Sequence, residues 1–204
     1  MRPIRQEQIC RAAARVIARK GFAGTTMRMI AEEAEVSTGL LNHYFANRQD
    51  LLTRALERAF ARAEARVGAA VVGLPPGRER LTALLDGALA EDEEAAEAWR
   101  VWINAYGEAV RLPELRSTIE THRRSWHALI EHALEGLLPS GGAAIPWSWR
   151  VEAMLNGLMI QVLTAPRAPR RAQVRDEIIG MLLPDLASTG EAGSRFGRRI
   201  VVHG

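Results

Sequence analysis

Cysteine is almost missing from this chain, since Cys10 is the only one among 204 residues. A single thiol excludes an internal disulfide framework and a multi-cysteine zinc site, and it favours a reducing environment. No apolar run is long enough to cross a bilayer, and the charged, amphipathic N-terminus is unlike a secretory signal. We therefore expect a cytoplasmic protein with no membrane partner.

Signatures of common enzymes are also missing. The chain contains no HExxH, no glycine-rich phosphate loop and no GxSxG. His122, His127 and His132 lie five residues apart, which turns successive side chains away from a common helix face and argues against a metal site. Cys10 faces no obvious histidine base, so a packed or partly exposed thiol is expected. The sequence predicts a protein that is not an enzyme and needs no cofactor or metal.

What the chain does have is an uneven distribution of charge. Its 27 Lys and Arg against 24 Asp and Glu give a net charge of +3, but residues 1–66 carry +5, residues 67–166 carry −5 and residues 167–204 carry +3. A basic first part followed by an acidic middle part indicates that only the first part contacts a polyanion. The five tryptophans all lie beyond the basic first part, at Trp99, Trp102, Trp126, Trp147 and Trp149. We therefore expect two functions on one chain.

Helical periodicity extends through nearly the whole sequence, which predicts an all-α fold of about nine helices. We place them near 3–20, 27–34, 38–44, 47–71, 78–89, 92–110, 113–138, 147–164 and 169–183. Thr25 or Thr26, Ser37 and Asn47 are the expected N-caps of the second, third and fourth helices. Residues 1–50 would form a three-helix helix-turn-helix domain, and the helix over 47–71 would connect it to a ligand-binding and dimerisation domain over 51–187. The Gly-, Ser- and Arg-rich residues 188–204 are expected to be a flexible tail.

The segment from Met27 to Tyr44 has a helix-turn-helix pattern. Ala31 is small where two helices must cross closely, and Leu41 and Tyr44 lie three residues apart, where they can pin the second helix to the first. A helix as short as residues 38–44 is not stable alone, so its neighbours must hold it. Its outer face is then free to enter the major groove of DNA.

Three adjoining segments resemble one known family: TTMRMIAEEA over 25–34, VSTGLLNHYF over 36–45 and RQDLL over 48–52. They are similar to the N-terminal domain of TetR-type (TetR/AcrR) repressors, and the resemblance covers about residues 5–55. The run STGLLNHYF is most similar to the BetI-type branch of that family, which responds to choline-like compounds. The resemblance implies a homodimeric repressor that binds a palindromic DNA operator and is released by a small-molecule effector.

The chain departs from the family pattern at two positions. Glu35 occupies the turn position where helix-turn-helix proteins often have glycine, which is tolerable if its φ is negative. Asn42 stands where the wider family often has tyrosine, and its amide can pair with adenine N6 and N7.

Residue roles follow from side-chain chemistry together with the resemblance. Phosphate contacts are predicted for side chains with hydroxyl, imidazole, phenol or guanidinium groups near helix N-termini or the groove edge, namely Thr26, Ser37, His43, Tyr44 and Arg48. Base contacts are predicted for Thr38, Gly39, Leu40 and Asn42, and Arg28 is assigned to a base or a phosphate. The simpler interpretation, in which Phe45 is core, Ser37 is only a cap and Tyr44 buries its ring, is accepted for Phe45. For Tyr44 the two interpretations are compatible.

An aromatic stripe marks the second function. Trp99, Trp102 and Tyr106 recur at helical spacing with Ile103 beside them, so they share one face and can hold a cation against their π systems. Two interpretations stand side by side, a packed core and the lining of an effector pocket. The pocket candidates are Trp99, Trp102, Ile103, Tyr106, Trp126, Met154 and Met159, and the resemblance implies a hydrophobic or choline-like cation.

A homodimer is expected because one short recognition helix reads too few bases to be specific. Two late helices have apolar residues that can serve both a core and a partner. The predicted interface residues are Ile119, Leu129, Ile130, Leu134, Val151, Leu155, Leu158 and Val162. A larger monomeric core is the alternative for these residues. For the whole chain, the alternatives are a non-specific, nucleoid-like DNA binder without an effector and an α-helical enzyme.

Overall fold

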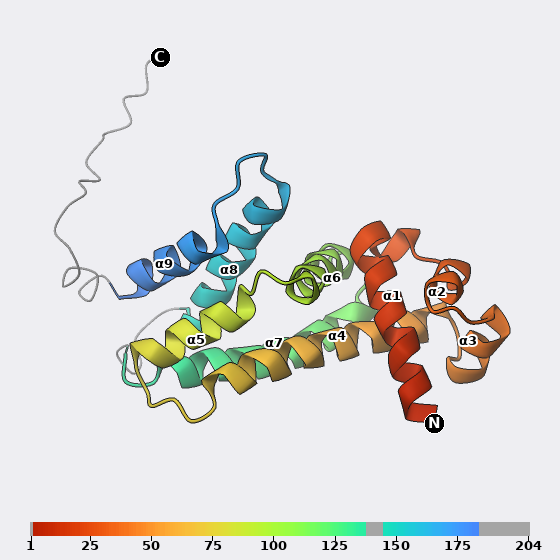
Figure 1. Ribbon diagram of the computed structural model, residues 1–204, viewed down its shortest axis with the longest axis horizontal. Helices are drawn as coiled ribbons and strands as arrows, with labels where there is room; N and C mark the ends of the chain where they lie inside the picture. Colours follow the sequence, from red (N-terminus) through yellow and green to blue (C-terminus); the bar gives the residue numbers. More distant parts are fainter. Residues whose placement is uncertain (1, 138–144, 184–204) are drawn as a thin grey trace, which may run out of the picture.

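The computed structural model of the chain describes residues 2–137 and 145–183. Over these residues it contains α1 (Arg2–Gly24), α2 (Met27–Glu33), α3 (Thr38–Tyr44), α4 (Arg48–Val71), α5 (Arg78–Ala88), α6 (Glu93–Ala109), α7 (Glu114–Leu134), α8 (Trp147–Thr164) and α9 (Arg171–Leu182). We call α1–α3 the head and α5–α9 the body, and Figure 1 shows α4 running lengthwise between them. The predicted all-α fold is confirmed. The predicted tail, residues 188–204, lies outside the described part of the chain.

The starts of α2, α3 and α4 are fixed by side-chain caps, as the sequence predicts. The Thr26 hydroxyl accepts a hydrogen bond from the Met29 N–H at 3.2 Å, and the Ser37 hydroxyl accepts one from the Leu40 N–H at 3.2 Å. The Asn47 side chain accepts the Asp50 N–H at 2.9 Å. Each cap satisfies one of the backbone donors that the first turn of a helix leaves free. Short α2 and α3 therefore begin at defined residues.

The turn between α2 and α3 differs from the expectation. Glu35 has a φ of +54° and is the only non-glycine residue with a positive φ in the described part of the chain. The Val36 N–H donates to the Ala31 carbonyl at 2.9 Å and the Glu35 N–H to the Glu32 carbonyl at 3.2 Å, which is the hydrogen-bond pattern of a Schellman cap. The negative φ that would make glutamate easily tolerated at this turn is therefore not adopted, and Glu35 occupies a position that favours glycine.

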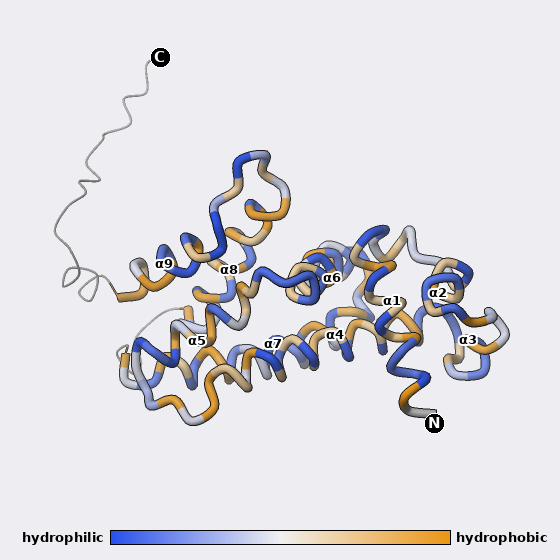
Figure 2. The backbone as a smooth tube through the Cα atoms, in the orientation of Figure 1, coloured by the Kyte–Doolittle hydropathy of each residue, from blue (hydrophilic) through white to orange (hydrophobic). Residues whose placement is uncertain are grey.

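The apolar side chains form two clusters that follow the length of the molecule. Figure 2 shows hydrophobic and hydrophilic segments alternating along the helices. The first cluster joins the head, the start of α4, and parts of α6 and α7, including Leu41, Phe45, Trp102 and Ile119. The second joins the end of α4 to α5, α7, α8 and α9. Because α6 and α7 contribute to the first cluster, the head packs directly on the body. No helix in the described ranges is long and apolar enough to span a membrane.

Candidate DNA-binding face and effector cavity

Helix α3 lies at the end of the molecule away from the body (Figure 1), and its outer face is exposed. Thr38, Gly39, Asn42 and His43 are exposed and Leu40 is half-buried, whereas Leu41 and Phe45 are buried in the core of the head. The buried pair therefore fixes the helix while the opposite side stays open. This is the geometry that a recognition helix requires. A methyl group added to Gly39 would meet only the Ser37 hydroxyl, at 3.8 Å, so the fold itself does not require glycine there.

Several predicted phosphate-binding groups lie around this face. Thr26 and Ser37 are exposed, and as N-caps their hydroxyls accept a backbone hydrogen bond while each O–H remains able to donate. The Arg28 side chain is 84% exposed and pairs with Glu32 one turn further along α2 at 2.9 Å. Tyr44 is half-buried, and its ring meets that of His43 edge-on at 5.2 Å between centroids. These positions are compatible with phosphate contacts at the rim of α3.

Arg48 has a different position from the one predicted. Its Nε donates to the Thr25 carbonyl at 2.6 Å and its Nη2 to the Phe22 carbonyl. The guanidinium at the start of α4 is thus bonded to the backbone that joins α1 to α2. We therefore correct its role from a free phosphate-binding group to a group that holds these elements together.

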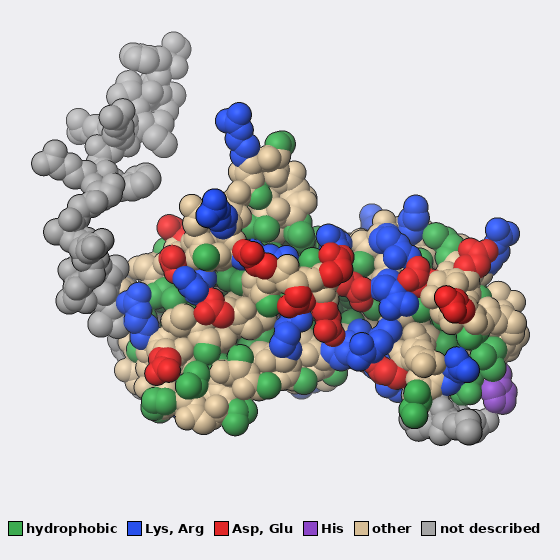
Figure 3. Space-filling model, in the orientation of Figure 1, with side chains coloured by type: hydrophobic (Ala, Val, Ile, Leu, Met, Phe, Trp, Pro, Cys, Tyr) green, Lys and Arg blue, Asp and Glu red, His purple; other side chains and the backbone are tan. Residues whose placement is uncertain are grey.

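Ion pairs add to the rigidity of the head. Glu33 on α2 accepts hydrogen bonds from two arginines of α1, Arg15 at 2.6 Å and Arg19. The Arg15 hydrogen bond is the main reason why the pKa of Glu33 lies below its usual value, with Arg19 reinforcing it. Figure 3 shows basic side chains gathered over α1 and where it meets α4. Since arginines here pair with carboxylates, part of the positive charge of the head is neutralised by ion pairs within the chain.

The body contains a cavity of about 60 Å³ against α4. Three of the predicted residues, Trp99, Trp102 and Trp126, line it, which favours the pocket interpretation over a core alone. The other predicted residues, Ile103, Tyr106, Met154 and Met159, lie outside the lining, and we correct their assignment. Met159 is fully buried in the second cluster, so it is a core residue.

The sequence interpretation missed the polar side of this cavity. Phe60 and Glu64 of α4, His122 of α7 and Asn156 of α8 also line it. The Trp102 indole N–H donates to the Asn156 side-chain oxygen at 2.9 Å, which fixes the orientation of that ring. Phe60 and Glu64 lie four residues apart, as do His122 and Trp126, and this spacing is the signal that could have revealed them. The cavity thus combines aromatic faces with one carboxylate.

A second polar cluster lies beside the cavity and involves Tyr106, which was predicted to line it. The Tyr106 hydroxyl donates to the carboxylate of Glu152, and His127 contacts the other oxygen of Glu152 at 2.7 Å. Burial, with the hydrogen bond to Glu152, raises the pKa of Tyr106. Arg123 lies 3.6 Å from Glu152 and donates to the Tyr106 hydroxyl at 3.2 Å. These groups contact one another, so they form a structural connection between α6, α7 and α8.

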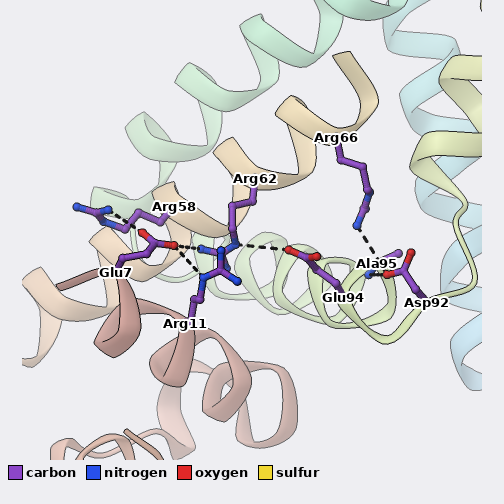
Figure 4. A network of polar contacts seen from close by, with 8 residues as sticks. All are labelled: Glu7, Arg11, Arg58, Arg62, Arg66, Asp92, Glu94 and Ala95. Atoms are coloured by element: carbon purple, nitrogen blue, oxygen red, sulfur yellow. Dashed lines mark hydrogen bonds and ion pairs between the residues drawn. The ribbon is translucent and has the colours of Figure 1, made fainter. Parts of the chain in front are cut away.

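A ladder of ion pairs connects the cavity wall to the head (Figure 4). Arg62 of α4 contacts Glu7 of α1 at 2.9 Å and Glu94 of α6 at 3.8 Å. One turn further along, Arg66 lines the cavity and lies 3.9 Å from Asp92, the N-cap of α6. Burial alone would raise the pKa of Glu7, but hydrogen bonds from Arg58 and Arg11 and the charge of Arg62 outweigh it and lower that pKa. Helices α1, α4 and α6 therefore meet through charged groups at one side of the cavity.

Comparison with known proteins matches the two parts of the chain that carry these sites to transcriptional regulators. Residues 9–55 match the family described as bacterial regulatory proteins of the tetR family, and residues 76–184 match the BetI-type transcriptional repressor C-terminal domain. The chain belongs to the TetR family. It is 30% identical over 161 residues to the HTH-type transcriptional regulator BetI of Rhizobium meliloti, covering 79% of each chain.

Solved structures of TetR-family regulators share the fold. A TetR-family regulator from Rhodococcus sp. has a TM-score of 0.77 and 27% identity, covering 87% of this chain and 96% of its own. A transcriptional regulator from Saccharomonospora viridis, solved in complex with choline, has a TM-score of 0.72 and 25% identity, covering 87% and 94%. The proteins of this family are DNA-binding transcriptional regulators and not enzymes, so the rival interpretation as an enzyme is set aside.

The predicted dimer residues of this TetR-family chain are mostly used inside the chain itself. Five of the eight are buried in the core of the single chain, namely Ile119, Ile130, Leu134, Val151 and Leu155. Side chains that are only 0–6% exposed leave almost no surface for a partner, so we correct their assignment to the core of the chain. Leu129, Leu158 and Val162 are half-buried. The outer face of α8 instead exposes Trp149, Ala153, Gly157 and Ile160, at helical spacing.

Proposed function

We propose that this TetR-family regulator is a dimeric repressor that binds a palindromic operator through α3 and is released by a small organic cation. The single observation that carries the effector part is the cavity itself, which is lined by Trp99, Trp102, Trp126 and Phe60 and also by the carboxylate-bearing Glu64. Aromatic faces attract a cation through their quadrupoles, and a carboxylate supplies the opposite charge. The choline complex of the Saccharomonospora viridis relative supports a quaternary ammonium compound.

The route from cavity to DNA runs along α4. Phe60 and Glu64 line the cavity, whereas Leu51 and Leu52 on the same helix are buried in the core of the head. An effector that separates α4 from α6 would strain the contacts of Arg62 with Glu7 and Glu94, and so tilt the head (Figure 4). In a dimer this tilt changes the distance between the two copies of α3 from the 34–36 Å repeat of the groove. A preference of a few kcal/mol for the non-binding spacing is enough to switch occupancy.

The partner face of the dimer is assigned to the outer side of α8. Trp149 and Ile160 are 45% and 41% exposed, and Gly157 between them has open space around it. We expect Gly157→Arg to fold normally but to sediment as a monomer, because the arginine would project from the centre of the interface. Ala128→Arg on the exposed polar side of α7 is the control, and it should remain dimeric. A dimer that survives Gly157→Arg would place the interface elsewhere.

Selection of bound DNA from a random pool tests the DNA part of the proposal. A palindromic consensus is expected, with two half-sites related by the two-fold axis of the dimer. Recovery of random sequences, with an affinity set by salt alone, would instead support a nucleoid-like binder. The selected operator then serves as the probe for effector release.

Calorimetry and operator release test the effector part. Choline, betaine aldehyde, tetramethylammonium and larger hydrophobic cations are titrated into the protein, and active compounds are added to the operator complex. Glu64→Gln should abolish cation binding, whereas Glu57→Gln, on the same helix two turns earlier and exposed, should bind as the wild type does. No response to any cation would remove this effector class and leave operator binding intact.

A further inference from the structure

His122 occupies the part of the cavity where a bound cation would be expected. Its ring stacks on Phe60 with centroids 4.2 Å apart and 21° between the planes, and it meets the edge of Trp102 at 4.7 Å. Its side chain is only 12% exposed. A histidine ring held between two aromatic side chains receives the same π interaction as an external cation once it is protonated.

The carboxylate of the cavity is directed at this histidine. Nδ1 of His122 contacts Oε1 of Glu64, whose side chain is 22% exposed. Within the described residues, this buried oxygen has no hydrogen-bond partner besides the His122 contact. The structure thus brings an imidazole, a carboxylate and two aromatic walls together from the chain itself.

From this arrangement we propose that protonated His122 is a built-in occupant of the cation subsite, which a cationic effector enters in exchange for the His122 proton. The proposal rests on the proposed cationic effector. On binding, the effector cation pairs with Glu64, His122 gives its proton from Nδ1 to solvent and becomes neutral, and no other bond changes. The total charge of the cavity is the same before and after the exchange.

The charged groups around the cavity favour this exchange. Helix α4 presents Glu64 and also Arg66, a cation that lines the same cavity. Helix α6 presents the neutral indole of Trp102 toward His122, and α8 presents the neutral amide of Asn156. Since Arg66 is paired with Asp92 at 3.9 Å, an effector added beside protonated His122 would leave two cations for the single carboxylate of Glu64 in a poorly solvated space, which is unfavourable.

Two further groups near α7 have partners of their own. Glu152 of α8 is held by Tyr106 of α6 and by His127, which lies on α7 five residues after His122. His127 is therefore a second histidine of similar burial, with a different carboxylate and no place in the cavity lining. This makes it the matched control for His122.

The exchange has a definite pH signature. Histidine side chains change charge between about pH 5 and 8. Below the pH at which His122 loses its proton, each effector molecule bound should release about one proton, and the affinity should rise up to tenfold per pH unit. Above that pH, the affinity should be constant and no proton should be released.

Calorimetric titration of the full-length protein with choline or tetramethylammonium, in phosphate and in MOPS between pH 5.5 and 8.5, measures both quantities. His122→Gln keeps a neutral polar side chain and should bind the cation with a pH-independent affinity and no proton release. His127→Gln should behave as the wild type does. A wild-type affinity that does not change with pH, or a pH dependence that disappears in His127→Gln rather than in His122→Gln, would overturn the proposal while leaving the cationic effector in place.

A readout without ligand separates the two proposals further. Protonated imidazole quenches neighbouring indoles, so the tryptophan fluorescence of the free protein should fall on acidification, and this fall should be smaller in His122→Gln. An unchanged fall in a folded His122→Gln protein contradicts the built-in cation. If neither the wild type nor His122→Gln binds any cation at any pH, the cationic effector and the proton exchange are both wrong.

Discussion

The DNA-binding face and the effector cavity are built in opposite ways. The DNA-binding face consists of residues that are close together in the sequence. Helix N-caps and two buried side chains, Leu41 and Phe45, hold the helix so that these residues point outward. The cavity collects side chains from five helices between Phe60 and Asn156 and turns them inward. Residues of the face can therefore change function with little effect on folding, whereas residues of the cavity serve stability and function at once.

Replacement of Trp102 tests the cavity side of this comparison with the largest effect. Trp102 is 8% exposed and contacts Phe60, Tyr106 and His122 where the head meets the body. Trp102→Ala should lower the free energy of unfolding by about 3–5 kcal/mol, measured by urea denaturation, because it leaves a cavity in the first apolar cluster. Trp102→Phe keeps most of the packing and loses the bond to Asn156, so we expect a smaller loss of about 1–2 kcal/mol. Equal losses in the two variants would mean that packing around this ring matters little.

The same difference explains what the sequence could predict. The caps at Thr26, Ser37 and Asn47 and the buried Leu41 act within a few residues, so local spacing was enough to locate the head helices and the outer face of α3. The tryptophans of the cavity were found because they repeat along a helix. Glu64 and His122 each lie four residues from an aromatic residue of the cavity, Phe60 or Trp126, but the contact between the two forms across α4 and α7, which local spacing does not show.

Two wrong assignments have a shared physical cause. An arginine at the start of α4 is typical of a phosphate contact, but the carbonyl groups that bind Arg48 come from Phe22 and Thr25, far away in the sequence. The stripe on α8 was correctly recognised as apolar, but burial of Val151 and Leu155 shows which side of it faces the chain's own core. Periodicity identifies a face, and only packing shows what covers it.

Arg28 of α2 and Arg48 at the start of α4 provide a second test of the comparison. Arg48→Ala leaves two backbone carbonyls without a charged donor and should cost about 1.5–3 kcal/mol of stability. Arg28→Ala removes an exposed side chain and should change stability by less than about 0.5 kcal/mol. On the operator, however, Arg28→Ala should weaken binding and reduce the slope of log affinity against log salt by about 1. Chemical denaturation measures the two changes in stability, and binding isotherms at several salt concentrations measure the effect of Arg28→Ala on operator binding. An unaltered stability in Arg48→Ala would restore the predicted role of Arg48 in binding phosphate.

Asn42 and Tyr44 are predicted to have different roles on the DNA-binding face, Asn42 in contacting a base and Tyr44 in contacting a phosphate. Asn42→Ala should reduce discrimination at one base pair of the selected operator by about 1–3 kcal/mol, because its amide can bond adenine in two places. Tyr44→Phe should weaken binding to the operator and to random DNA by the same factor, since a phosphate contact carries no sequence information. Binding isotherms on the operator, on single-base variants and on random DNA measure these ratios. Equal loss on operator and random DNA in Asn42→Ala would contradict base reading by Asn42.

The smallest effect is expected at the turn that positions α3. Glu35 adopts a φ of +54° as the terminal residue of a Schellman cap, where a side chain meets its own backbone. Glu35→Gly relieves this strain but adds flexibility to the unfolded chain, so the net gain should be about 0.5–1 kcal/mol. Glu35→Ala keeps the strain and removes the charge, which makes it the control in the same denaturation series. If alanine stabilises as much as glycine does, repulsion of the Glu35 carboxylate by the nearby Glu32 and Glu33, rather than the backbone, is what costs stability at this turn.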